Sequence, residues 1–333
     1  MAKHSQTSTP EQKADAPVRR DLKAGPLSRG DKWFFRSTSI AANFAFVLVG
    51  LVLLFLLINS WPTLQQQGIM FIFGDQWKAE GDNPVMQLGP MLWGTILVSI
   101  LGVLIATPMA IAAAYLIEFF LPASLARAAT LTIDLLAALP SVVIGLWGIF
   151  VFTPVVAQWG TILNQLLGWI PVFHMADPSK PAAYSPWVAG WILAIMIVPI
   201  ITSVSREIFS QMDDALVNGA LALGGSRTSV LRRVILPTAA PGVIGGILLG
   251  LGRAIGETVA ILFVLQLSFK INWYEILEPR GGDVASWILA RFGEATTAEF
   301  GGLMAAGLVL FIFTLLVNTL ANIIVSRSKT ANR

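Results

Sequence analysis

Long apolar stretches alternate with short polar segments from residue 40 almost to the C-terminal end of the sequence. A helix needs roughly 20 apolar residues to cross the hydrocarbon core of a bilayer. Six stretches reach or approach that length, so the pattern predicts six transmembrane helices. We expect them at Ile40–Ile58, Met91–Ile117, Leu131–Val151, Trp187–Val204, Val243–Leu265 and Leu303–Val325.

The polar segments divide the chain into a membrane domain and two tails. Residues 1–36 are polar, mixed in charge and rich in Ser, Thr, Pro and Lys, and such a composition cannot bury a core. We therefore expect a disordered tail over 1–36, a transmembrane domain over 37–326 and a short tail over 327–333. The apolar stretch Ile162–Val172 is too short to span, and we expect it outside the membrane as an interfacial or re-entrant piece.

The composition agrees with a polytopic, all-α membrane protein. Of the 333 residues, 55% are hydrophobic and 12% are charged, and the mean hydropathy is +0.72. This is about half the charge of an ordinary soluble domain, which excludes a soluble enzyme, a nucleic-acid-binding protein and a disordered protein. The chain has no Cys and only two His, so neither thiol catalysis nor a metal site is expected.

The distribution of positive charge predicts the orientation in the membrane. Lys and Arg favour the cytoplasmic loops of membrane proteins. With the N-terminus inside, the inner segments hold 16 of the 22 Lys and Arg residues, the outer segments hold 5, and Arg253 lies in a span. We therefore expect both termini in the cytoplasm.

Three ionisable side chains lie inside the predicted spans: Asp134, Arg253 and Glu257. Such a group at bilayer depth costs about 2.5 kcal/mol or more, so each should face protein or a water-filled path. Arg253 and Glu257 are four residues apart and are predicted to share one face of the fifth helix. Because a guanidinium offers paired N–H donors to a tetrahedral oxyanion, we expect Arg253 on an anion path. A structural ion pair is the alternative, and it is the favoured interpretation for Asp134.

Helix breakers and small residues add two further predictions. Pro140 interrupts the third span and Ser141 follows it, which is typical of helices that line a cavity. Gly242, Gly246 and Gly250 recur every four residues and form a smooth ridge that lets another helix approach closely. The partner of this ridge is either another helix of this chain or a second subunit.

The longest internal polar segment, residues 205–239, carries the most specific pattern. Two short helices joined at Gly224–Gly225 are expected there, because Gly permits the positive φ that such a turn needs. The spacing resembles the EAA loop of ABC-importer permeases: Glu-Ala-Ala, three residues, Gly, nine residues, then Ile-x-Leu-Pro. The matching positions are Asn218, Gly219, Ala220, Gly224, Val234, Leu236 and Pro237, with Asn218 and Gly219 departing from the Glu and the first Ala.

That resemblance implies docking of the 205–239 segment onto an ATP-hydrolysing subunit. The chain has no Gly-x-x-x-x-Gly-Lys-Ser/Thr motif, so it is expected to bind no ATP and no other cofactor itself, and the partner ATPase would hold ATP and Mg²⁺. The spans contain no His and no base–nucleophile set, which argues against a membrane hydrolase. A channel or secondary transporter working alone is the remote alternative, since it would have no ATPase to dock.

Two span signatures narrow the resemblance. Ile133–Gly148 is similar to the third-span signature of phosphate ABC permeases, and Arg253–Ala260 is similar to their fifth-span signature. The Gly-Leu-Trp-Gly ending at Gly148 resembles the C-type subunit more than the A-type subunit. The chain is thus identified as similar to the C-type permeases, which implies a type I importer fold in a prokaryotic cytoplasmic membrane.

The same resemblance implies the partners and the substrate. They are an A-type permease, two ATPase subunits, an extracytoplasmic phosphate-binding protein, and phosphate, with sulfate or molybdate as the alternative oxyanion. The substrate path is then expected along Arg253, Glu257, Asp134, Ser141 and Thr258.

Overall fold

The computed structural model describes residues 28–81, 83–177 and 179–331, with the backbone alone for residue 322 and residues 324–331. The predicted tail lies outside the described residues as far as residue 27. The chain forms two units, Met1–Val52 and Leu53–Arg333, and the smaller one holds the first part of the first helix.

Within the described part of the chain, six helical stretches are long and apolar enough to cross a membrane, which confirms the predicted number. Short helices and one hairpin connect them. The six stretches are α1 (Arg29–Gln67), α3 (Gly89–Phe119), α5 with a π-helical turn and α6 (Ser141–Trp147, Gly148–Phe152, Thr153–Leu167), α7 (Pro186–Ser210), α9 with a π-helical turn and α10 (Arg227–Val230, Leu231–Ile235, Leu236–Ile255), and α13 (Thr297–Ala331) as far as Ala321. The connecting elements are α2 (Met70–Phe73), β1 (Trp77–Lys78), β2 (Val85–Met86), α4 (Ala123–Ala137), a 3₁₀ turn (Pro171–Phe173), α8 (Asp214–Ala222), α11 (Val259–Val264) and α12 (Val284–Phe292).

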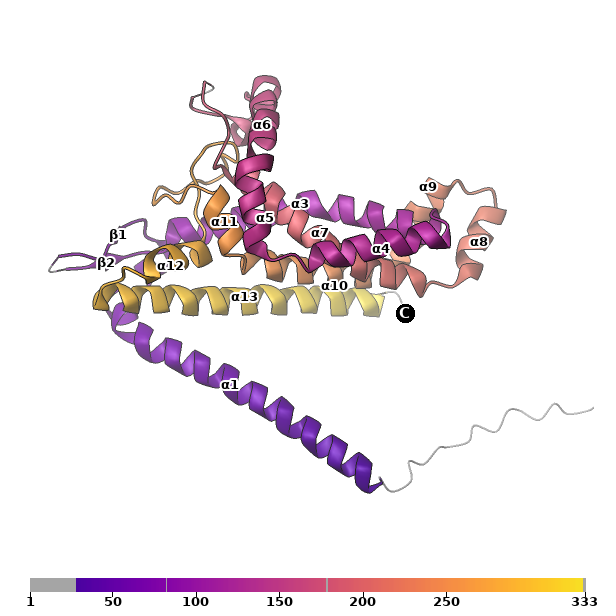
Figure 1. The fold of residues 1–333 in the computed structure, drawn as a ribbon, viewed down its shortest axis with the longest axis horizontal. Helices are drawn as coiled ribbons and strands as arrows, with labels where there is room; N and C mark the ends of the chain where they lie inside the picture. The colour runs from indigo at the N-terminus through magenta and orange to yellow at the C-terminus, as the bar shows by residue number, and fades with distance from the viewer. Residues whose placement is uncertain (1–27, 82, 178, 332–333) are drawn as a thin grey trace, which may run out of the picture. The chain divides into compact units, whose positions relative to one another are not determined.

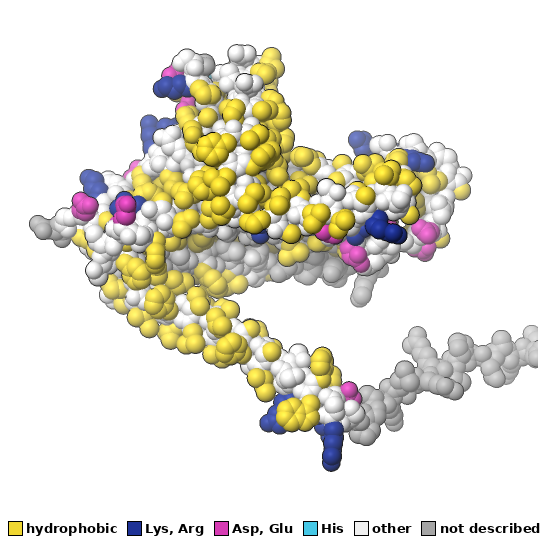
Figure 2. All heavy atoms as spheres, viewed as in Figure 1, with side chains coloured by type: hydrophobic (Ala, Val, Ile, Leu, Met, Phe, Trp, Pro, Cys, Tyr) yellow, Lys and Arg dark blue, Asp and Glu magenta, His cyan; other side chains and the backbone are white. Residues whose placement is uncertain are grey.

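The core of the larger unit is built by helices that run alongside one another. α7 lies between α3 and α10, and α10 also contacts α13 (Figure 1). The buried side chains between α3 and α7 are aliphatic, among them Val98, Ile192 and Ile197. Figure 2 shows hydrophobic side chains over α4, α5 and α6, with charged side chains gathered near α8 and α9 and near the β1–β2 hairpin. This distribution fits a bilayer around the apolar helices.

The glycine ridge of α10 packs inside the chain. A Cβ atom placed on Gly246 would lie 3.0 Å from Val204 of α7, and one on Gly250 would lie 3.0 Å from Ile201. Gly242 faces Ile208 in the same way. The structure therefore assigns this ridge to α7 rather than to a second subunit.

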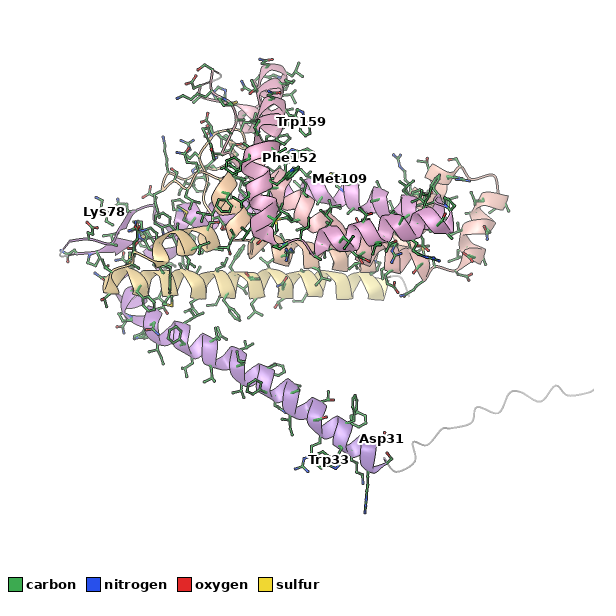
Figure 3. The ribbon with its side chains drawn as sticks, in the orientation of Figure 1. Asp31, Trp33, Lys78, Met109, Phe152 and Trp159 are labelled. Atoms are coloured by element: carbon green, nitrogen blue, oxygen red, sulfur yellow. The ribbon has the colours of Figure 1, made fainter. Side chains whose placement is uncertain are left out.

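The third predicted span, Leu131–Val151, is wrong in its bounds. α4 ends at Ala137 and α5 begins at Ser141, because Pro140 lacks an N–H and disfavours helical backbone in the residue before it. The apolar helix continues instead to Leu167, so the first part of Ile162–Val172 is the end of this helix and not a separate piece. α5 and α6 run across the direction of α4 (Figure 1). Phe152 and Trp159 project from this stretch (Figure 3), with ring centroids 6.3 Å apart.

The fifth predicted span, Val243–Leu265, is also wrong in its bounds. The helical stretch begins at Arg227 and ends at Ile255, and α11 is a separate short helix. Glycine is a poor helix former, and Gly256 sits at the C-terminal end of α10. Arg253 and Glu257 consequently do not share a helical face, since the helix ends between them.

The first helix begins within the predicted N-terminal tail. Helix α1 already begins at Arg29. Its start is a reciprocal cap in which Asp31 N–H donates to Ser28 Oγ (3.2 Å) and Ser28 N–H donates to the Asp31 carboxylate (3.0 Å). Such capping fixes a helix start ahead of the apolar stretch. At the other end, α13 continues to Ala331, into the predicted tail 327–333.

Candidate functional site

The break after α10 brings three of the predicted path residues together. Arg253 lies exposed in the last turn of α10, whereas Glu257, past the end of the helix, is only 7% exposed. The N–H of Ala260 lies 3.5 Å from Glu257 Oε1, and the Thr258 hydroxyl donates to the Gly256 carbonyl at 3.3 Å. Among the described residues Arg253 has no ion pair. Its guanidinium is therefore available to an external anion.

The face of α10 that carries Arg253 is open. Leu249, four residues before Arg253, lies on the same side of α10 as Arg253. A groove follows this face, lined by Gly245, Leu249 and Gly252 of α10 and by Asn318 of α13. The sequence analysis missed Asn318, an uncharged polar residue in a long apolar stretch. The groove continues along α10 from the neighbourhood of Arg253 towards the 205–239 segment.

A buried carboxyl group, Asp283, lies next to the same break. It caps α12: the Ser286 N–H donates to Asp283 Oδ2 at 2.7 Å, and the Ser286 hydroxyl lies 2.7 Å from the same oxygen. The Thr95 hydroxyl of α3 lies 3.1 Å from Asp283 Oδ1. The Ser286 hydroxyl is also 2.9 Å from the Thr258 carbonyl. Asp283 thus joins α3, α12 and the break beside Arg253.

The pKa of Asp283 is raised to about 6. Burial raises this pKa most, and the charge of nearby Glu257 adds to the rise, whereas the hydrogen bonds from Ser286 and Thr95 lower it. Two buried carboxyl groups, Asp283 and Glu257, therefore lie close enough at the break for the charge of one to affect the other. The sequence analysis missed Asp283 because it lies in a polar segment outside the predicted spans. The only local signal is an Asp three residues before Ser286, a spacing typical of a helix cap.

The raised pKa of Asp283 predicts a pH-dependent stability. An unfolded Asp has a pKa near 3.9, so the folded state holds this proton more tightly. The stabilisation is present below pH 4 and is lost as the pH rises through about 6. For a shift of about two units it amounts to at most about 3 kcal/mol. We expect Asp283→Asn to flatten the dependence of the thermal unfolding midpoint on pH between 4 and 6. Asp177→Asn, at an exposed carboxyl whose pKa is lowered chiefly by a hydrogen bond from Ser179, is the control and should leave that fall in place.

A close approach of two glycines sets the position of Asp283. A Cβ on Gly94 of α3 would lie 2.2 Å from the carbonyl oxygen of Gly282, the residue before Asp283. This neighbour is backbone, which cannot move aside as a flexible side chain can.

We expect Gly94→Ala to lower the free energy of unfolding by about 1–3 kcal/mol, although Ala favours helix over Gly. Gly293→Ala, where a Cβ meets nothing within 4 Å, is the matched control. Equal thermal unfolding midpoints for the two variants would contradict this packing.

The structure does not place Asp134 with Arg253. Asp134 is exposed on α4, where it lines a groove with Arg127, Thr130 and Arg206, and α4 is not one of the six candidate spans. Ser141 is the first residue of α5. Its helix packs on α11, because a Cβ on Gly145 would lie 2.8 Å from the Ala260 Cα atom. Ser141 is thus tied to the break after α10 through α11, and Asp134 is not.

The 205–239 segment has the predicted helix–turn–helix form. The Asp213 carboxylate caps α8 and the Ser226 hydroxyl caps α9. Gly224 has a φ of +83°, so the expected glycine turn between them is confirmed. The second helix is longer than predicted, because α9 continues through a π-helical turn into α10. The predicted coupling residues Val234, Leu236 and Pro237 therefore lie within a helical stretch that leads to Arg253.

The C-terminal end of α3 contacts the 205–239 segment. The Tyr115 hydroxyl donates to the Arg227 carbonyl at 3.1 Å, and the Arg227 guanidinium lies 4.7 Å from the centre of the Phe120 ring. A hollow between α3 and α8 is lined by Asn218 and Leu221, among others. Gly219, like Gly224, has open space where a Cβ would be.

Leu223 is the most exposed large apolar side chain of this segment, at 91%, and Leu216 is 51% exposed. The sequence analysis missed both, because nothing in the sequence distinguishes them from the other three leucines of this segment. Their exposure next to the glycine turn marks a surface that a partner protein can cover.

The comparisons with known proteins decide the family. Residues 106–330 match the family described as "Binding-protein-dependent transport system inner membrane component". The chain belongs to this family. The family's match begins within α3 and includes α10, α13 and the helix–turn–helix segment between α7 and α10.

Its curated relatives carry a narrower description. The protein named "Phosphate transport system permease protein PstC" of Xylella fastidiosa is 36% identical over 314 residues, which cover 93% of this chain and 94% of that protein. "Phosphate transport system permease protein PstC 2" of Mycobacterium tuberculosis is 34% identical over 301 residues, or 90% and 93% of the two chains. Among solved structures, a chain of the MetNI methionine ABC transporter in an inward-facing conformation matches with a TM-score of 0.51 at 13% identity. The match covers 72% of this chain and 94% of that one. This last likeness shows the type I permease fold alone.

Proposed function

We propose that this chain is the C-type permease subunit of an ATP-driven phosphate importer. The observation that carries the proposal is the guanidinium of Arg253, which is exposed, forms no ion pair with any described residue and lies next to the groove along α10. A planar guanidinium donates two parallel N–H groups to a phosphate oxygen pair. The names of the curated relatives support phosphate as the oxyanion.

The chain itself has no catalytic site in this proposal. It forms half of the path, and an A-type permease forms the other half. Two cytoplasmic ATPase subunits bind ATP and Mg²⁺, and an extracytoplasmic phosphate-binding protein delivers the substrate. Both termini lie in the cytoplasm, as the distribution of Lys and Arg favours. The α8–α9 turn then faces the ATPase.

The helical stretch from Arg227 to Ile255 supplies the mechanical link. It has 29 residues and is therefore about 43 Å long at 1.5 Å per residue. One end begins directly after the α8–α9 turn and the other carries Arg253. A movement of the ATPase at the turn would be transmitted along this stretch and would reorient Arg253 with respect to the path. Glu257 and Asp283 are buried at the break and fix the position of the end of this stretch that carries Arg253.

The experiment is uptake of labelled phosphate into proteoliposomes that contain the whole complex, with the binding protein outside and ATP at the ATPase. We expect uptake that resists excess sulfate and molybdate and stops when the ATPase is left out. Uptake of sulfate or molybdate in place of phosphate would support an ATP-driven importer but would show that phosphate is not its substrate. Uptake that continues without the ATPase would overturn the importer mechanism and support a transporter that works alone.

A further inference from the structure

A second basic site lies on α4, away from the break that carries Arg253. Its lining includes Arg127, Thr130 and Asp134 of α4 and Arg206 of α7. The three α4 residues are separated by three and four positions, so they share one face of that helix. The Arg206 Nη1 atom donates to the Thr130 hydroxyl at 2.9 Å. Two arginines therefore line one groove, and one of them is held by a hydroxyl of α4.

Neither arginine is neutralised by a neighbouring acid. In the part of the chain that the structure describes, none of Arg127, Arg206 and Asp134 forms an ion pair. Asp134 lies two turns of α4 beyond Arg127, and it lines the groove without pairing with either guanidinium. Neither guanidinium charge is therefore compensated by an acid, and the N–H donors of Arg206 other than the one that bonds Thr130 remain available to an anion.

The groove lies at one edge of the apolar helices. Arg127 is in the first turns of α4, shortly after α3 ends at Phe119, and Arg206 is close to the end of α7 at Ser210. Next to the basic face, α4 exposes Leu131 and Leu135 at about 60% each. Exposed apolar side chains therefore follow Arg127 one and two turns along α4, beside the basic groups.

We propose that this groove binds the headgroup of an anionic phospholipid, with the phosphodiester between Arg127 and Arg206 and the acyl chains along Leu131 and Leu135. Basic pockets between membrane helices recognise anionic headgroups in this way. Under the proposed orientation the site belongs to the inner leaflet. The binding itself is independent of the proposed transport function. Asp134 faces the bound anion and weakens its binding.

The test is binding of phosphatidylglycerol to the detergent-purified complex, measured by native mass spectrometry over a range of lipid concentrations. Two arginines near a membrane surface contribute about 1 kcal/mol each. The double variant Arg127→Gln/Arg206→Gln should therefore bind about thirtyfold more weakly, and Asp134→Asn should bind several-fold more tightly. The matched control is Arg232→Gln/Arg233→Gln, which removes two exposed arginines of the α9–α10 stretch and should leave the affinity unchanged.

Three results would overturn the proposal. They are unchanged binding in the Arg127/Arg206 variant, an equal loss in the Arg232/Arg233 control, and displacement of the lipid by millimolar inorganic phosphate. The last result would assign the groove to a free anion. Phosphatidylcholine, which has the phosphodiester without net charge, should compete poorly. Because no transport is measured, failure of the phosphate-uptake experiment would leave this result standing, and the reverse also holds.

Discussion

Replacement of Arg253 by alanine is expected to reduce ATP-driven phosphate uptake by a hundredfold or more while the complex still assembles. Each hydrogen bond to a charged group contributes about 1.5–3 kcal/mol, so the loss of two should remove about 3 kcal/mol or more, a factor of over a hundred. Arg253 is exposed and has no ion pair among the described residues, so its removal leaves no buried acid unpaired. The measurement is uptake in proteoliposomes, with assembly followed by size-exclusion chromatography.

Two further variants separate charge, geometry and shape at this position. Arg253→Lys keeps the positive charge and loses the planar fork, so it should transport at an intermediate rate. Leu249→Ala, one turn away on the same open face of α10, removes apolar surface alone and should transport normally. If Arg253→Ala takes up phosphate like the unmodified protein, Arg253 has no part in the mechanism and the proposed path is wrong.

The six-span architecture could be predicted from the sequence because the bilayer imposes a minimum apolar length on every crossing. The interruptions of those spans could not be placed by the same argument. An apolar stretch has the same mean hydropathy whether its backbone forms one continuous helix or a broken one. Hydropathy therefore could not show that α10 ends at Ile255. Pro140 was recognised as an interruption, but its consequence, a change of direction between α4 and α5, depends on packing against α7 and α11.

Only part of the candidate site could be predicted, because a charged residue is conspicuous in the sequence only when it lies in a predicted span. Arg253 and Glu257 stand out because charge is rare in a span, and the structure does bring them to one break. Asp283 carries the same kind of charge in a polar segment, where only tertiary packing buries it. Asp134 was placed at bilayer depth by a span that the structure divides differently, and it lines another groove. Charge in a span is thus a good signal only where the bounds of the span are right.

Leu223→Asp is expected to abolish docking of the ATPase while the permease itself stays as stable as before. Leu223 is 91% exposed, so it contributes little to the packing of the chain. Covering a leucine side chain in an interface contributes about 1.5–3 kcal/mol, and a carboxylate in the same apolar pocket would lose that and add a desolvation cost. We expect the affinity for the ATPase to fall at least thirtyfold, measured by co-purification and by titration of the labelled ATPase.

The position of Leu223 explains why its effect should exceed that of its neighbours. It follows the last residue of α8 and precedes Gly224, whose positive φ reverses the chain and leaves the leucine at the tip of the turn. The stretch from Arg227 to Arg253 begins just beyond this turn, so loss of contact here disconnects the ATPase from the path. Leu223→Met keeps an apolar side chain of similar volume and should dock and transport normally. Full uptake and an unchanged ATPase affinity in Leu223→Asp would show that coupling runs through another surface, because no carboxylate can take the place of a leucine in an apolar contact at so small a cost.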